Sequence, residues 1–259
     1  MNETVLITGA SSGIGLELAK RFAADKSNLI LVARSTTALE KLAAELRREH
    51  KIEVHVFTAD LSRPESPPEI FEQAGRAGLT VDVLVNNAGF GLHGGFAELP
   101  LKRQMEMVQV NIAALVALTG LFLPGMIQQK RGGILNVGSV AGFLPGPNMA
   151  VYFATKAFVL SFSEALHEEL RDSGVTVTDL CPGPTETNFF QTARSHRTRR
   201  MQVVKKMSAA KVAVAGHRAF RQGQCVNVPG VKNFLLAQLP RISPRSAIRQ
   251  TVAHYNKLK

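Results

Sequence analysis

The segment MAVYFATKAFVLSF, residues 149–162, places Tyr152 four residues before Lys156 in an otherwise apolar stretch. Residues four apart share one face of an α-helix, so the lysine ammonium can lie near the tyrosine phenol. An ammonium stabilises the phenolate, and we expect it to lower the phenol pKa from its ordinary value of about 10 toward neutrality. Such a phenol is a usable general acid and base, whereas surface packing is the alternative for a pair that stands alone.

A glycine-rich segment, TGASSGIG (residues 8–15), follows the first predicted strand and precedes the first predicted helix. Its glycines allow a tight turn that presents backbone N–H groups and a helix N-terminus to an anion. The spacing, G-x-x-x-G-x-G, differs from the commoner dinucleotide fingerprint and from the phosphate-binding loop, and a glycine turn that binds nothing is the alternative. The residues expected at a dinucleotide are Gly9, Ser11, Ser12, Gly13, Ile14 and Gly15.

The ends of the next three predicted strands carry residues suited to the rest of a dinucleotide. Arg34 ends the second strand, where a guanidinium accommodates a ribose 2′-phosphate and an acid would bind the free 2′-hydroxyl. Because LILVARST contains no Asp or Glu, the sequence favours NADP(H) over NAD(H), and a solvated surface arginine is the alternative. The further expected contacts are Asp60 with the adenine amino group, Leu61 beside the adenine ring, and Asn87, Ala88 and Gly89 against the cofactor.

Runs of β-branched and apolar residues alternate with longer segments of helical periodicity along the chain. This alternation is typical of βαβ units and predicts an α/β fold, with a parallel sheet covered by helices on both faces. The strands are expected within residues 4–8, 29–34, 53–60, 82–89, 132–139, 175–183 and 225–230, and helices within 14–25, 36–50, 101–127 and 152–171.

The composition, with 45% hydrophobic and 20% charged residues, predicts one globular domain over residues 1–259. Cys181 and Cys225 are too few for a disulfide framework and lack zinc-ligand spacing, so we expect a reducing cytoplasm. The N-terminus lacks the pattern of a secretory signal. The longest apolar run, residues 111–127, contains Pro124 and is shorter than the roughly 20 residues that span a membrane, which predicts a buried helix and no transmembrane segment.

Six features in the order TGASSGIG, NNAG, Asn111, Ser139, YFATK and CPGPTET resemble the short-chain dehydrogenase/reductase family. The resemblance covers residues 3 to about 190, and each feature lies at the C-terminal end of a predicted strand or on the expected helix. It implies a Rossmann-type doubly wound parallel sheet of seven strands, in the order 3-2-1-4-5-6-7, with the cofactor across its carboxyl edge.

The resemblance also implies the roles of the site residues. Tyr152 exchanges the proton, Ser139 donates a hydrogen bond to the substrate carbonyl oxygen, and Asn111 anchors a water that relays protons to Lys156. Lys156 also hydrogen-bonds the nicotinamide ribose. The nicotinamide is bracketed by the backbone at Pro182 and Gly183 and by the side chain of Thr185.

No metal site is expected, because the histidines are scattered and HEEL lacks the second histidine of H-E-x-x-H. His93, in the loop GFGLHGG, is predicted to be a solvated loop histidine, with a place beside the substrate as the alternative. Cys181 is predicted to pack as a small apolar residue at a strand end.

These inferences predict an NADPH-dependent carbonyl reductase, reversible to an alcohol dehydrogenase, for a 3-oxoacyl thioester, a steroid, a retinoid or another hydrophobic carbonyl. A nonenzymatic NADP(H)-binding scaffold or sensor is the alternative, and the presence of all four site residues argues against it. A nucleic-acid-binding module is a third hypothesis, but the basic segment has few aromatic residues and no recognisable nucleic-acid-binding motif.

The net charge of +11 is concentrated in the C-terminal quarter, since residues 191–259 hold 15 Lys and Arg and no Asp or Glu. The resemblance implies that residues 188–222 form a mobile lid over the substrate, and the cations there need an anionic partner. We favour coenzyme A or an acyl carrier protein, with an anionic membrane surface and a solvated basic face as alternatives. The resemblance also implies a homodimer or homotetramer built on residues 101–127 and 153–171.

Overall fold

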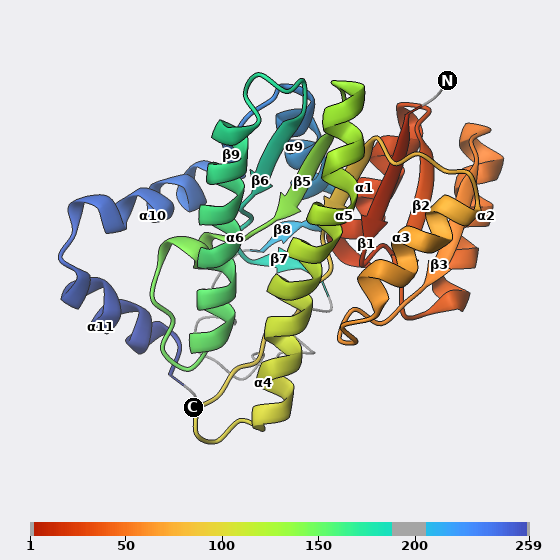
Figure 1. The fold of residues 1–259 in the computed structure, drawn as a ribbon. Coiled ribbons are helices and arrows are strands. Elements are labelled where there is room, and N and C mark those ends of the chain that lie inside the picture. Colours follow the sequence, from red (N-terminus) through yellow and green to blue (C-terminus); the bar gives the residue numbers. More distant parts are fainter. Residues whose placement is uncertain (1–2, 188–205, 258–259) are drawn as a thin grey trace.

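The computed structural model describes residues 3–187 and 206–257. Its main sheet has seven parallel strands in the order β3-β2-β1-β4-β5-β6-β9, which confirms the predicted doubly wound sheet (Figure 1). The seventh strand is β9 because two short strands, β7 (Thr185–Glu186) and β8 (Met207–Ser208), form a separate small sheet before it. The strands of the main sheet are β1 (Thr4–Thr8), β2 (Asn28–Ala33), β3 (Val54–Thr58), β4 (Val83–Asn86), β5 (Gly133–Val137), β6 (Thr176–Leu180) and β9 (Val226–Asn227).

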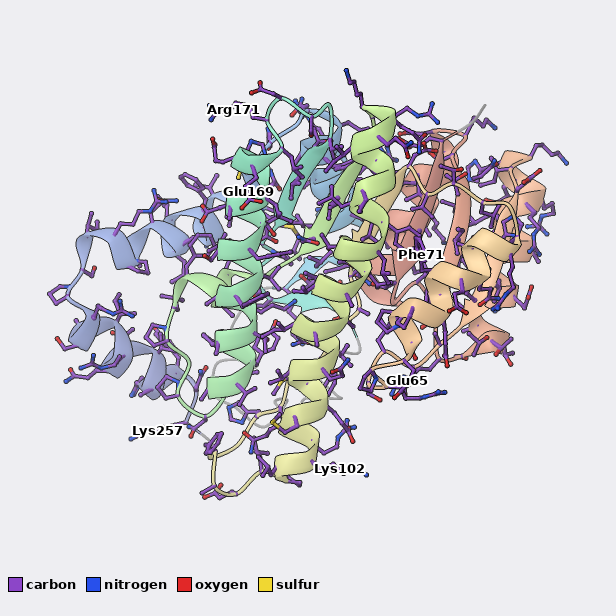
Figure 2. The ribbon with its side chains drawn as sticks, in the orientation of Figure 1. Glu65, Phe71, Lys102, Glu169, Arg171 and Lys257 are labelled. Carbon is purple, nitrogen blue, oxygen red and sulfur yellow. The ribbon has the colours of Figure 1, made fainter. Side chains whose placement is uncertain are left out.

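Successive side chains of the buried strands enter two hydrophobic clusters, one on each face of the sheet. Val5 and Ile7 of β1 belong to one cluster and Leu6 to the other, as the alternation of side chains along a strand requires. Helices α1 (Gly13–Ala24), α2 (Thr36–His50) and α9 (Ala209–Arg221) cover the first face, and α3 (Ser66–Arg76), α5 (Ala114–Gln129) and α6 (Ala150–Glu169) cover the second. In the second layer, Phe71 of α3, which is labelled in Figure 2, meets Phe122 of α5 edge to face, with ring centroids 5.2 Å apart.

The helix predicted over residues 101–127 is continuous in the structure but is not uniform. Its first part, α4 (Leu101–Val108), passes through a π-helical turn at Gln109–Ala113 into α5. In the described part of the chain, the combined helix Leu101–Gln129 is the one helix long and apolar enough to cross a membrane by length and composition alone. Core helices of soluble proteins share that property, so it is weak evidence for a membrane span.

Residues 209–221 form α9, which packs against α1 with Val212, Ala213 and Phe220 buried in the core. The prediction of a lid over residues 188–222 is therefore wrong for this part. The reason is that this segment is an amphipathic helix, and its apolar face is buried more completely in the core than it would be as a lid over an open cavity. Residues 188–205 of the predicted lid lie outside the described residues.

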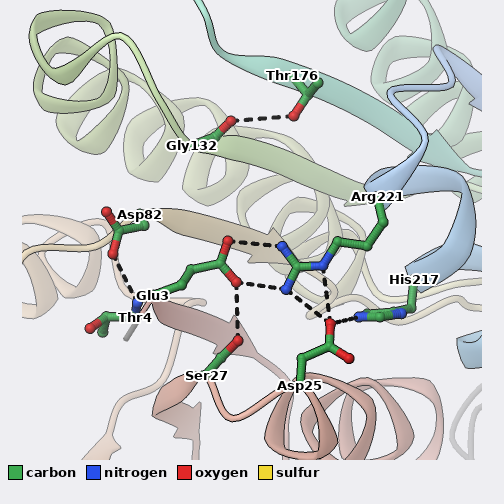
Figure 3. A network of polar contacts seen from close by, with 9 residues as sticks. All are labelled: Glu3, Thr4, Asp25, Ser27, Asp82, Gly132, Thr176, His217 and Arg221. Atoms are coloured by element: carbon green, nitrogen blue, oxygen red, sulfur yellow. Dashed lines mark hydrogen bonds and ion pairs between the residues drawn. The ribbon is translucent and has the colours of Figure 1, made fainter. Parts of the chain in front are cut away.

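A polar network ties α9 to the beginning of β1 and the end of α1 (Figure 3). Arg221 donates to the two carboxylate oxygens of Glu3 at 2.9 and 2.7 Å, and its Nε donates to Asp25 Oδ2 at 3.2 Å. His217 Nε2 lies 2.8 Å from the same Asp25 oxygen, while burial lowers the pKa of the His217 ring. A guanidinium that donates two hydrogen bonds to one carboxylate is a strong contact of defined geometry, so this network holds α9 against β1 and α1.

Two C-terminal helices, α10 (Val231–Ile242) and α11 (Arg245–Tyr255), are absent from the predicted elements. They form a pair beyond β9, on the side of α6, and project away from the sheet (Figure 1). Sequence periodicity does not reveal α10, because apolar residues occur all round it and Pro240 lies inside it. Three side chains of the pair pack with the cluster that contains Tyr152, namely Leu236, Ile248 and Val252.

Candidate active site

The carboxyl ends of the central strands border a cavity of about 630 Å³. The strand order reverses between β1 and β4, and open α/β sheets bind their ligands at such a point. Gly15 and Asn111 are the predicted site residues that do not line this cavity. The predicted residues that line it are Gly9, Ser11, Ser12, Gly13, Ile14, Arg34, Asp60, Leu61, Asn87, Ala88, Gly89, Ser139, Tyr152, Lys156, Pro182, Gly183 and Thr185.

The turn after β1 requires glycine for two different reasons. Gly9 and Gly13 have φ angles of 66° and 58°, a conformation that other residues rarely adopt. A Cβ on Gly15 would lie 2.4 Å from Asn87 Nδ2, so this glycine acts behind the cavity wall by allowing close packing. Ser12 is the N-cap residue of α1, and its side chain makes no capping hydrogen bond to the helix. The first N–H groups of α1 are therefore suited to bind a pyrophosphate.

Asn87, just beyond β4, fixes that turn from the neighbouring strand. Its Nδ2 donates to Thr8 O at 2.8 Å, and its backbone N–H donates to Thr8 Oγ1 at 3.0 Å. The backbone N–H of Ala88 donates to the same hydroxyl at 3.0 Å. These bonds hold the ends of β1 and β4 in one arrangement, which is the preorganisation that a dinucleotide site needs.

Two charged residues border the cavity where β2 and β3 end. Arg34 directly follows β2 and is exposed, while Asp60 follows β3 and accepts from the backbone N–H of Ser62 at 3.0 Å. Burial raises the pKa of Asp60, but the hydrogen bonds from Ser62 and the charges of Arg34 and Arg63 outweigh it, so the pKa lies below its ordinary value. Asp60 is therefore a charged acceptor, and the Arg34 guanidinium is accessible to an anion.

Ser139 and Tyr152 both line the cavity, and the Ser139 hydroxyl acts to lower the pKa of the Tyr152 phenol. Ser139 lies two residues beyond the end of β5 and N-caps a short 3₁₀ helix (Val140–Phe143). Its Oγ accepts from Ala141 N at 3.1 Å and donates to Pro182 O at 3.4 Å. These contacts hold the hydroxyl beside the phenol.

The pKa of Tyr152 departs from the expected direction. Burial raises the pKa to about 12, although the Ser139 hydroxyl opposes this shift. The prediction of a pKa near neutrality is therefore wrong for this structure. Desolvation disfavours the phenolate, and the Lys156 ammonium is directed instead to Val137 O, to which its Nζ donates at 2.6 Å.

Asp179, on β6, is buried behind the cavity wall, and the sequence analysis missed it. Its Oδ1 accepts from Gly138 N at 2.9 Å, and its Oδ2 accepts from the Cys181 thiol at 3.1 Å. Burial raises the pKa of Asp179 to about 6, and burial lowers the pKa of Lys156 while the Asp179 charge opposes that decrease. A signal was present, because one carboxylate stands in the otherwise uncharged strand segment VTVTDL. Cys181 is buried, as predicted.

Asn111 lies behind the cavity in the π-helical turn and is buried. Its Nδ2 donates to Phe90 O and to Thr155 Oγ1, both at 3.0 Å, and its Oδ1 accepts from Phe90 N at 3.1 Å. A Cβ on Gly89 would lie 3.1 Å from that Oδ1 and 3.7 Å from Lys156 Nζ, so the amide and the ammonium border one small space. The water relay at Asn111 stays a prediction.

His93 is buried, with 7% of its surface exposed, and it lines the cavity, so the prediction of a solvated loop histidine is wrong. Its Nε2 lies 3.0 Å from Asn256 O. Because a carbonyl oxygen only accepts, Nε2 carries the ring hydrogen, and burial lowers the ring pKa despite that bond. Nδ1 is then a bare acceptor, and it is buried with no hydrogen-bond partner in the described structure.

The cavity wall beside Tyr152 is mainly apolar. Its other lining residues there are Phe90, Val110, Leu144, Met149 and Phe153, together with the ion pair of Arg103 and Glu106. Within residues 3–187 and 206–257, no group of three or more His, Cys, Asp or Glu is placed to hold a metal ion. The site therefore combines a phenol, a hydroxyl and an ammonium with room for an apolar compound.

The sequence matches the family model described as short chain dehydrogenase over residues 3–198. The chain belongs to the short-chain dehydrogenase family. It is 34% identical over 186 residues to the very-long-chain 3-oxoacyl-CoA reductase of Homo sapiens, which covers 70% of this chain but only 59% of that relative. It is 40% identical over 191 residues to sulfoacetaldehyde reductase 2 of Chromohalobacter salexigens, and the aligned stretch covers 73% of this chain and 75% of that relative. A short-chain dehydrogenase of Sphingobium yanoikuyae in complex with NADPH has a TM-score of 0.82 and 36% identity over 88% of both chains.

The matched stretch spans less than two thirds of the Homo sapiens relative, and both of these curated relatives are named as reductases. Among similar solved structures, the one from Sphingobium yanoikuyae holds NADPH and one from Burkholderia phymatum holds NAD. The residues of the cavity fit such a cofactor, because the glycine turn and the N-terminus of α1 suit a pyrophosphate. Arg34 and Asp60 stand where the adenosine half would lie.

Proposed function

We propose that this short-chain dehydrogenase is an NADPH-dependent reductase of hydrophobic ketones or aldehydes, reversible to oxidation of the corresponding alcohols. The observation that carries the proposal is that Ser139 and Tyr152 line the same cavity as Lys156 and the glycine turn. This arrangement places a proton donor and a hydroxyl against an apolar wall, where a carbonyl group can enter.

When bound, NADPH supplies the hydride that forms the new C–H bond at the carbonyl carbon. Tyr152 gives its phenolic proton to the carbonyl oxygen, so that C=O becomes C–OH and a phenolate remains. The Ser139 hydroxyl donates to the same oxygen, on which negative charge develops. Lys156 is the cation that stabilises the phenolate until it regains a proton. Asn111 holds the backbone of Phe90 beside them.

The substrate proposed first is a 3-oxoacyl thioester, supported by the name of the Homo sapiens relative and by the apolar wall. Sulfoacetaldehyde is a second candidate, supported by the name of the Chromohalobacter salexigens relative. NADPH consumption measured with acyl thioesters, diketones, steroids, retinoids, sugars and sulfoacetaldehyde tests both. We expect kcat/KM to be highest for a hydrophobic carbonyl. NADPH binding without turnover of any compound would favour the nonenzymatic scaffold.

Arg34 is proposed to select NADP(H) by pairing with the ribose 2′-phosphate. We expect Arg34→Asp to reverse the preference, because the carboxylate repels NADPH and offers an acceptor to the ribose of NADH. The lost charge-assisted contact amounts to roughly 1.5–3 kcal/mol, or about 10- to 150-fold in affinity. Titration of the protein with NADPH and with NADH measures the two affinities. Equal affinity of the unsubstituted protein for NADPH and NADH would contradict the assignment.

His93 is proposed to accept a hydrogen bond from the substrate through its bare Nδ1. His93→Phe keeps an aromatic ring but removes the acceptor, so we expect KM to rise about 3- to 10-fold for a carbonyl compound with a nearby hydroxyl or amide donor. Steady-state kinetics with a matched compound that lacks the donor is the control, since its KM should change little. An equal rise for both compounds would reduce His93 to a structural role.

A homodimer or homotetramer is proposed, assembled through α4, α5 and α6. These helices expose large apolar side chains, which favour an interface: Leu101, Met105, Val116, Ile127 and Phe158. Light scattering at micromolar concentration measures the assembly, and a monomer would contradict it.

Coenzyme A or an acyl carrier protein is proposed as the acidic carrier of the substrate, and a reducing cytoplasm as the location. Cys181 and Cys225 are both free, which supports a reducing compartment. Most of the basic segment considered for the carrier lies outside the described residues. This is tested by measuring kcat/KM for a thioester and for its carrier-free analogue at low and high salt. An electrostatic contact with the carrier weakens as salt increases, so only the thioester should lose kcat/KM at high salt.

A further inference from the structure

One face of α10 is mainly apolar and exposed, with Gln238 as the one polar residue within it. Its apolar members follow one another in the sequence by three, one, four and three residues, a spacing that places them on one side of a helix. The opposite face packs inward, where Ala237 is the one fully buried residue and Leu236 joins the cluster around Tyr152. The α10 stripe consists of Val231, Phe234, Leu235, Leu239 and Ile242, which are 76%, 50%, 58%, 42% and 82% exposed.

Positive charges border the α10 stripe, and negative charges are absent from this part of the sequence. A rotation of about 100° per residue places Lys232 at one edge of the stripe and Arg241 at the other. Arg245 and Arg249 on α11 are also exposed. No Asp or Glu occurs in residues 191–259, so no acid of α10 or α11 neutralises these cations.

A second copy of the chain is a poor partner for this surface. In a two-fold interface the same patch faces itself, so Lys232 and Arg241 would meet further cations with no acid from either helix. An anionic lipid surface supplies both of the missing partners. Its headgroups pair with the cations, and the apolar boundary beneath them receives the side chains of the stripe.

We propose that α10 docks this protein on an anionic membrane surface, with the α10 stripe at the boundary between headgroups and acyl chains. The pair α10 and α11 projects from the body (Figure 1), and the stripe lies on the exposed face of α10. The inner face of the same helix packs with the cluster that contains Tyr152 and Phe153. Docking therefore brings the substrate cavity close to the lipid, which shortens the path of a hydrophobic carbonyl into it.

A fluorescent reporter tests insertion directly. The chain contains no tryptophan, so Phe234→Trp places a single indole in the α10 stripe. With vesicles of phosphatidylcholine and phosphatidylglycerol, we expect its emission to shift to the blue and to be quenched by brominated acyl chains. Phe71→Trp on α3, at a position 42% exposed, is the matched control and should not respond. The absence of a response from Phe234→Trp would overturn the proposal.

Two double substitutions separate the apolar and the charged contributions in vesicle sedimentation. Val231→Gln with Ile242→Gln removes apolar surface, and Lys232→Glu with Arg241→Glu reverses charge. Each is expected to weaken binding on the order of tenfold or more, while leaving turnover of a water-soluble carbonyl unchanged. Binding that survives the glutamine substitutions would overturn insertion of the stripe.

Two controls separate docking through α10 from a general effect of net charge. Arg48→Glu with Arg76→Glu changes the net charge equally at exposed positions on α2 and α3, and binding should persist. Vesicles of phosphatidylcholine alone should bind at least about tenfold more weakly than anionic vesicles. If light scattering shows that Val231→Gln with Ile242→Gln dissociates an oligomer, the stripe is a contact between copies and the membrane proposal fails.

Discussion

Tyr152→Phe is expected to retain NADPH binding while turnover falls on the order of 10²-fold or more. The substitution removes the phenolic oxygen but keeps the ring, which meets Phe153 edge to face with centroids 6.0 Å apart. The proton donor is therefore lost without a cavity in the core. NADPH consumption measures turnover, and a fluorescence titration measures affinity. Unchanged turnover would eliminate Tyr152 as the general acid.

The raised pKa of Tyr152 adds a pH dependence to this expectation. A pKa of about 12 keeps the phenol protonated through neutral pH. Reduction uses the protonated phenol, so its rate should be level near neutrality and fall as the pH rises toward the phenol pKa. Oxidation of the alcohol uses the phenolate, so its rate should rise over the same range. Both slopes should vanish in Tyr152→Phe, and slopes that persist would assign the titration to another group.

The fold could be predicted because its central elements are specified locally. β1 and α2 begin and end at the predicted residues, Thr4–Thr8 and Thr36–His50, since each has an unbroken pattern of one period between turn residues. α9 and α10 were not found this way. The apolar face of α9 packs against α1, which is far away in the sequence, so the local pattern does not show what α9 covers. α10 has apolar residues on two faces, so its sequence does not show which face packs against the rest of the protein.

The sequence could predict which residues come together at the site, but it could not predict their pKa values or their burial. Parallel strands place their carboxyl ends at one edge, so residues at strand ends gather there wherever they occur in the sequence. The pKa of Tyr152 and the burial of His93 depend on the solvent that surrounding elements exclude. Asn256 of the C-terminal segment supplies the carbonyl oxygen that contacts His93, and no local pattern connects the two.

Lys156→Met is expected to weaken both NADPH affinity and turnover, each by on the order of tenfold or more, because one ammonium is proposed to serve the ribose and the phenol. Methionine keeps most of the buried apolar stem and removes the charge. Titration gives the affinity, steady-state kinetics gives kcat, and Lys156→Arg is the control that keeps a cation. A loss confined to affinity or to turnover would restrict Lys156 to one of the two roles.

Stability provides an independent test of whether the charges of Lys156 and Asp179 act on each other. Lys156→Met removes the cation whose charge acts on the buried Asp179 carboxylate, so part of the resulting loss of stability should depend on that carboxylate being charged. The Asp179 pKa of about 6 limits that loss at acidic pH, where the carboxyl is protonated, and the loss should grow as the pH rises above it. Asp179→Asn keeps an acceptor for Gly138 N and removes the charge. The unfolding free energy lost through Lys156→Met, measured in denaturant at neutral pH, should therefore be about 1–3 kcal/mol smaller in the Asp179→Asn background. Additive losses would show that the two side chains do not interact.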